Sequence, residues 1–149
     1  MEIVPYQKEY WEELQLVHDL ARMQELKSAG LTDAFLPLSV AAEREGLFDY
    51  RIYVAVQGNA LVGFVAFTED ELAWLYVHPK CQRQGIGRAL VQFALDHMDS
   101  EEKTVEVLQG NEPARNLYRS MGFVKEELRH GHMPGNETFA VSAWQMTKL

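Results

Sequence analysis

The residues with the clearest chemical use are 82–88, Gln-Arg-Gln-Gly-Ile-Gly-Arg, which stand between a short apolar run and apolar residues at helical spacing. A helix start carries backbone N–H groups without intrahelical partners and a partial positive charge. Gly85 and Gly87 lack Cβ atoms, so a phosphate can approach the backbone closely. Arg83 and Arg88 add cations that pair with phosphate oxygens. The stretch therefore predicts a pyrophosphate-binding loop.

Two known phosphate-binding patterns fit this loop unequally. The P-loop pattern fails, because no Gly-Lys-Ser/Thr follows Gly85. The dinucleotide fingerprint finds glycines at Gly85 and Gly87 but Leu90 at its third glycine position, and the loop lies mid-chain instead of opening the fold. Glu106 stands about where a ribose-binding acid would be, so spacing alone leaves a dinucleotide open.

A second motif accompanies the loop, and it reads Asn111-x-x-Ala114-x-x-Leu117-Tyr118-x-x-x-Gly122-Phe123. Together with Val-His-Pro at 77–79 and the glycine loop, it resembles the two sequence blocks of the GCN5-related N-acetyltransferases, the GNAT superfamily. The two blocks span residues 71–123. The resemblance implies acetyl-coenzyme A as co-substrate and an α/β (α+β) fold over residues 1–149, with a mixed, mostly antiparallel central sheet flanked by helices.

The same resemblance implies which residues bind the coenzyme. The strand ending at Val77 is expected to diverge from the strand containing Val107, so that the pantetheine arm bonds to free backbone groups as an added strand would. Asn111 is expected to contact this arm, to cap its own helix, or to do both. The implied coenzyme-binding residues are Leu75, Tyr76, Val77, Gln82, Arg83, Gln84, Gly85, Ile86, Gly87, Arg88, Asn111 and Tyr118.

Acetyl transfer to an amine requires a positioned thioester, a deprotonated amine and a protonated leaving thiolate. The resemblance implies Tyr118 as general acid, since a phenol of pKa about 10 can protonate a thiolate; a packed core aromatic is the alternative. Glu71 and Glu106 stand where family members carry a general base, and an ordered water is the alternative to both. His130 and His132 are weaker candidates.

The apolar periodicity and the turn residues predict the element order β-α-α-β-β-β-α-β-α-β-β. Ser39 is expected to cap the second helix. Gly63, inside a strand, predicts a bulge or a close approach. The resemblance suggests Phe35, Leu36, Phe48 and Tyr50 as walls of the acceptor site, with core packing as the alternative. The expected strands are 2–4, 51–56, 61–68, 72–77, 104–108, 123–128 and 138–147, with helices at 7–27, 39–45, from 85 to about 98 and from 111 to 122, and a polar loop at 130–136.

Composition limits the function classes. The chain has 149 residues and a net charge of −8, which suits one domain and argues against nucleic-acid binding. The charge is compatible with a cationic small-molecule or peptide amine as acceptor. No signal peptide or membrane span is expected, and Cys81 is the one cysteine, which fits a cytoplasmic setting. No metal site is expected, because His130-x-His132 lacks further ligands nearby. A homodimer and a catalytically silent acyl-CoA-binding module stay open.

Overall fold

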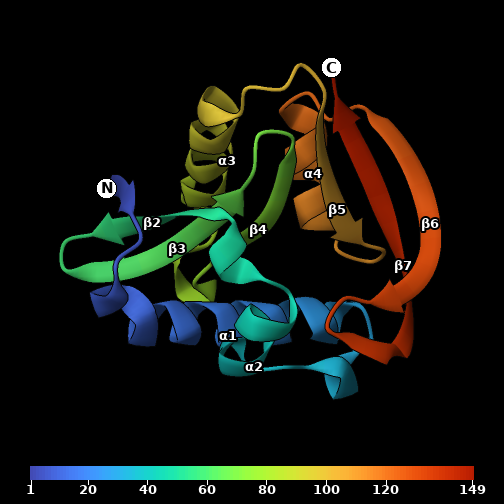
Figure 1. Ribbon diagram of the computed structural model, residues 1–149, viewed down its shortest axis with the longest axis horizontal. Helices are drawn as coiled ribbons and strands as arrows, with labels where there is room; N and C mark the ends of the chain where they lie inside the picture. Colours follow the sequence, from blue (N-terminus) through green and yellow to red (C-terminus); the bar gives the residue numbers. More distant parts are fainter.

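The computed structural model describes residues 1–149, and its central element is a seven-stranded sheet in the order β1-β2-β3-β4-β5-β7-β6 (Figure 1). The elements follow one another in the predicted order. No helix is both long and apolar enough to cross a membrane. The strands are β1 (Glu2–Pro5), β2 (Arg51–Gln57), β3 (Ala60–Phe67), β4 (Glu71–Val77), β5 (Lys103–Leu108), β6 (Lys125–Met133) and β7 (Asn136–Lys148). The helices are α1 (Trp11–Ser28), α2 (Leu38–Arg44), α3 (Ile86–His97) and α4 (Glu112–Ser120).

Helices cover both faces of this sheet, so its middle strands are buried on both sides. On β3, Val65 and Phe67 pack with the α3 side of the sheet, whereas Phe64 and Ala66 pack with the α1 and α2 side. This alternation follows from the two-residue period of a strand. It explains why β3 reads as a continuous apolar run instead of an alternating one.

The sheet opens between β4 and β5, its one parallel pair. These strands pair only at Glu71↔Thr104 and Leu72↔Val105, while every other neighbouring pair is antiparallel. Beyond Leu72 the two strands run apart (Figure 1). The predicted divergence at Val77 is therefore present, and the facing edge of β4 has no ladder partner from Ala73 onward.

Gly63 lies where β3 approaches β4 and α3 most closely. The β2–β3 register shifts beside it, and a Cβ at Gly63 would lie 2.9 Å from the Tyr76 carbonyl oxygen and 3.2 Å from Leu90 Cδ1. The bulge and the close approach predicted from an in-strand glycine are both confirmed.

Local patterns misplaced three boundaries. Ser39 does not cap α2; the helix begins at Leu38, whose N–H donates to Asp19 Oδ1 of α1 at 2.8 Å, a cap from a distant residue that no local pattern reveals. The first α-helix begins at Trp11 after a 3₁₀ turn, not at residue 7. Residues 130–133 are strand instead of loop, because β6 continues its pairing with β7 to Met133 and its polar residues face solvent.

Candidate active site

A cavity of about 530 Å³ lies beside the glycine loop, at the open edge of β4. We call it the loop-side cavity. Of the residues predicted to bind the coenzyme, all line it except Gln84 and Tyr118. The lining also includes the α1 residues Ala21, Gln24, Glu25 and Ser28 and the α4 residues Pro113, Ala114 and Leu117.

The loop is fixed to the end of β4 by side-chain hydrogen bonds. Gln82 Nε2 donates to the Val77 carbonyl oxygen at 3.1 Å and to Gln24 Oε1 of α1 at 2.8 Å. Gly85 has a φ of 83°, in the left-handed region that favours glycine, and α3 begins at the next residue. Arg83 also adopts a left-handed φ, of 64°, which costs a non-glycine residue about 1–2 kcal/mol. The backbone and the first turn of α3 therefore form the anion-binding shape that the sequence predicts.

Asn111 caps α4, as one of the two predicted uses requires. Its Oδ1 accepts the Ala114 N–H at 3.4 Å, and its side chain also lines the loop-side cavity. Tyr118 lies two turns further along α4, buried and edge-on against Phe123 with ring centroids 5.7 Å apart. Burial raises the pKa of Tyr118 far above its usual value, and the nearby Glu25 carboxylate raises it further. Tyr118 does not line either cavity described here, although Leu117 before it does.

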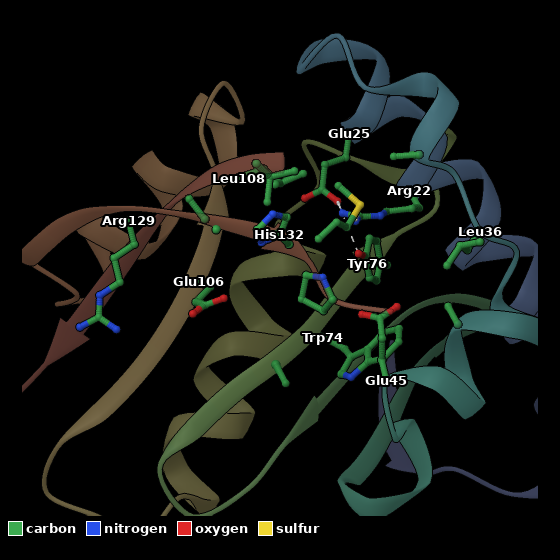
Figure 2. A pocket seen from close by; sticks show the side chains of 18 of the residues that line it. Arg22, Glu25, Leu36, Glu45, Trp74, Tyr76, Glu106, Leu108, Arg129 and His132 are labelled. Carbon is green, nitrogen blue, oxygen red and sulfur yellow. Dashed lines mark hydrogen bonds and ion pairs between the residues drawn. The ribbon is translucent and has the colours of Figure 1, made fainter. Parts of the chain in front are cut away.

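A second cavity, of about 370 Å³, lies between α1, the α2 region and β6 (Figure 2). We call it the hairpin-side cavity. It gathers Glu106, Leu36, His130 and His132, four of the predicted catalytic or acceptor-side residues. Trp74 and Tyr76 of β4 form an aromatic wall (Figure 2), and Arg129 of β6 also lines the cavity.

Other predicted residues lie elsewhere. Glu71 lines neither cavity, and its carboxylate accepts a hydrogen bond from Tyr50 Oη at 3.1 Å. Phe48 is 57% exposed and packs on Trp11, while Phe35 packs against a small apolar cluster of Leu26, Ala34 and Met133 and does not itself line the hairpin-side cavity. For Phe35, Phe48 and Tyr50 the packing alternative describes the structure better than a wall of the acceptor site.

The sequence reading missed five ionisable residues of the hairpin-side cavity: His18, Arg22, Glu25, Glu45 and Arg129. The first three recur at i, i+4 and i+7 on α1, a polar stripe on a helix face that packs against the sheet, and this spacing was the available signal. Burial lowers the pKa of His18, although Asp19 Oδ1 lies 2.9 Å from its Nδ1 and opposes the shift.

Glu45 and Glu25 add two carboxyl groups to this cavity. Burial raises the pKa of Glu45 to about 7, with Arg22 partly offsetting the shift and Glu137 adding to it. Glu25 and Tyr76 are the two residues that line both cavities, so the cavities meet at these side chains. No group of three or more His, Cys, Asp or Glu side chains is arranged to hold a metal ion.

Comparison with known proteins agrees with this geometry. A family model described as an acetyltransferase (GNAT) domain matches residues 48–125, which is more than half of the chain. The match covers both sequence blocks, the open edge of β4 and the glycine loop. The chain belongs to the GNAT acetyltransferase family.

Individual relatives fit the same assignment. The chain is 39% identical to the peptidyl-lysine N-acetyltransferase YiaC of Escherichia coli over 72 residues. The aligned residues make up 48% of each protein. The curated relatives it matches first are covered over about a quarter to a half of their own length.

Solved structures share the fold across nearly the whole chain. A GCN5-related N-acetyltransferase from Rhodopseudomonas palustris aligns with a TM-score of 0.79 at 21% identity, covering 99% of this chain and 94% of that one. The PaiA N-acetyltransferase of Thermoplasma acidophilum, solved in complex with coenzyme A, aligns with a TM-score of 0.70 at 20% identity, covering 99% and 97%. The predicted fold class is confirmed.

Proposed function

We propose that this GNAT-family chain is an acetyl-CoA-dependent N-acetyltransferase that acetylates a primary amine by direct attack within a ternary complex. The observation that carries the proposal is the meeting of two differently built cavities at Glu25 and Tyr76. A coenzyme arm in the loop-side cavity and an amine in the hairpin-side cavity would come together at this shared wall. Binding both reactants in one place converts a bimolecular step into an effectively unimolecular one.

The loop-side cavity fits coenzyme A in shape and in chemistry. The left-handed Gly85, the first turn of α3 and the cations Arg83 and Arg88 suit a pyrophosphate. The edge of β4 at 75–77 has no ladder partner, so its backbone groups can bond to the amides of a pantetheine arm, apart from the Val77 carbonyl oxygen, which already accepts from Gln82. When bound, acetyl-CoA supplies the activated thioester.

Tyr118 is the general acid in this proposal. A tyrosine phenol is protonated at neutral pH, so Oη can give a proton to the departing thiolate. Burial raises the pKa of Tyr118 and makes the phenol a weaker acid in the free protein, so the transfer requires the developing thiolate to lie against Oη. The preceding residue, Leu117, lines the loop-side cavity, which supports this role.

Glu106 is the better of the two predicted general bases. It lines the hairpin-side cavity, where the acceptor amine would lie, and can receive the proton directly or through a water. Glu71 is held by Tyr50 outside both cavities and is the weaker candidate. The name of YiaC, a peptidyl-lysine N-acetyltransferase, favours a peptide amine over a small-molecule amine as acceptor.

Two measurements test the proposal. The unfolding temperature of the protein is measured in parallel with coenzyme A, NAD and ATP, and coenzyme A should raise it most. A ligand that binds only the folded state raises the stability of the protein. A thiol-release assay with acetyl-CoA should respond to one class in a panel of lysine peptides, N-terminal peptides and polyamines. Stabilisation by coenzyme A without release on any amine would favour the catalytically silent binding module. Stabilisation by NAD alone would overturn the coenzyme assignment.

A further inference from the structure

Glu25 occupies a special place, at the boundary between the two cavities. Its side chain is 19% exposed, and the residue lines both of them. Figure 2 shows Glu25 at the hairpin-side cavity. It comes from the last turns of α1, which cross beneath the open edge of β4 (Figure 1). A group at this boundary is placed to influence how a coenzyme arm and an acceptor amine face one another.

Each carboxylate oxygen of Glu25 has its own partners. Oε1 forms the ion pair with Arg22 and accepts a hydrogen bond from Tyr76 Oη at 3.4 Å. Oε2 accepts from Asn111 Nδ2 at 2.9 Å. The first oxygen thus anchors the carboxylate to α1 and β4, and the second is directed to the side chain that caps α4.

The amide of Asn111 is held at both ends. Its Oδ1 accepts the Ala114 N–H, and one of its two Nδ2 protons goes to Glu25. If the Asn111 amide were flipped, Oδ1 would face the Glu25 carboxylate and Nδ2 would face the Ala114 N–H. The orientation of the amide is therefore fixed. The second Nδ2 proton is left over, on a side chain that lines the loop-side cavity.

We propose that Glu25 is a positioning residue for the coenzyme: by holding the Asn111 amide, it presents the second Nδ2 proton to a carbonyl oxygen of the pantetheine arm. This inference rests on the proposed function. A stabilising role alone explains the arrangement less well, since a mostly buried ion pair such as Arg22–Glu25 is often no more stabilising than a well-packed apolar pair. The Arg22 contact is better understood as an anchor that keeps the carboxylate against Asn111.

Calorimetric titration with coenzyme A tests the inference without an acceptor. Glu25→Met keeps the side-chain length but removes the acceptor oxygens, and it should weaken coenzyme affinity about tenfold. Glu25→Gln keeps one acceptor oxygen, but its NH2 group must face a donor, either Arg22 or Asn111, so it should recover only part of that loss. Glu12→Met, on an exposed position of the same helix, is the control and should bind as the wild type does.

A double-mutant cycle separates positioning from general structure. If Glu25 acts through Asn111, Glu25→Met added to Asn111→Ala should change coenzyme affinity less than about twofold. An equal loss in both backgrounds, or wild-type affinity in Glu25→Met, would overturn the inference while leaving the proposed function in place. Failure of the wild type to bind coenzyme A would overturn both.

The wild-type protein offers a second readout if a variant is too unstable to titrate. The two side-chain amide protons of Asn111 are distinct in an NMR spectrum. Coenzyme A should shift one of them strongly, and the proton bonded to Glu25 should move much less. If both protons are unchanged at saturating coenzyme, Asn111 does not contact the arm and the inference fails.

Discussion

The two cavities are built in opposite ways. Most of the loop-side lining comes from two short segments, residues 75–88 and 111–117, with α1 adding one side. The hairpin-side lining is assembled from α1, residues 34–45, β4, β5 and the β6–β7 hairpin. The loop-side cavity therefore depends on fewer segments of the chain than the hairpin-side cavity does.

The two cavities also differ in which chemical groups they offer. The loop-side cavity presents backbone groups, glycines and arginines, which bind phosphates and amides of almost any sequence context. The hairpin-side cavity presents side chains, among them Glu45, Glu106, Arg129 and Trp74 (Figure 2). Substitutions should therefore separate into those that alter coenzyme use and those that alter acceptor choice.

The largest expected effect is on turnover. Tyr118→Phe should lower kcat for thiol release about 10²- to 10³-fold, because it removes the proton held for the thiolate. Coenzyme affinity should change less than about threefold, since the ring still packs on Phe123. Tyr53→Phe, a substitution of the same kind on a tyrosine that packs on Phe93 away from both cavities, is the control. Unchanged kcat in Tyr118→Phe would show that the acid is another group.

Alanine substitutions at two glycines, Gly63 beside β4 and Gly131 in β6, test how tightly the backbone is packed at each position. Gly63→Ala would place Cβ 2.9 Å from the Tyr76 carbonyl oxygen, so β4 must shift, at a cost of about 1–3 kcal/mol of unfolding free energy. Gly131→Ala, in the hairpin-side lining, meets nothing within 4 Å and should be neutral or slightly stabilising. Urea denaturation of both variants measures the difference. Equal stabilities would mean that β4 yields more easily than its packing indicates.

A smaller effect should depend on pH. Because burial raises the pKa of Glu45 to about 7, the folded state holds this proton more tightly than the unfolded chain, whose pKa is about 4.5. Stability is therefore lost as pH rises from about 4.5 to 7. Glu45→Gln should stabilise the protein by about 1–2 kcal/mol at pH 8, after discounting for partial exposure, and by little at pH 4.5.

Thermal unfolding at both pH values measures this change. Glu43→Gln, an exposed neighbour on α2, serves as the control and should show no pH-dependent difference from the wild type. A Glu45→Gln gain of the same size at pH 4.5 and pH 8 would contradict the protonation account.

The sequence predicted the loop-side cavity well because its determinants are local. Gly85 marks a left-handed backbone conformation, and Asn111 marks a helix start, so spacing alone locates them. The open edge of β4 was expected from family resemblance, and the pairing that stops at Leu72 bears it out.

The hairpin-side cavity could not be read in the same way. His18, Arg22 and Glu25 look like ordinary polar residues of an amphipathic helix until β4 and β6 are placed against them. The prediction that Ser39 caps α2 failed for the same reason, since the capping group is Asp19 of α1, which lies next to Leu38 only in the folded structure. Glu106 was singled out because its strand position resembles that of the family base and because its spacing from the glycine loop suits a ribose-binding acid.

We assign the coenzyme to the loop-side cavity and the acceptor to the hairpin-side cavity. This assignment can be tested by titrating coenzyme A into ¹⁵N-labelled protein and measuring the chemical-shift changes of the backbone amides. The account predicts the largest shifts at residues 75–77 and 82–88 and at Asn111, with residues 129–134 nearly unchanged. Large shifts at 129–134 together with a silent glycine loop would contradict it, because the coenzyme would then occupy the cavity assigned to the acceptor.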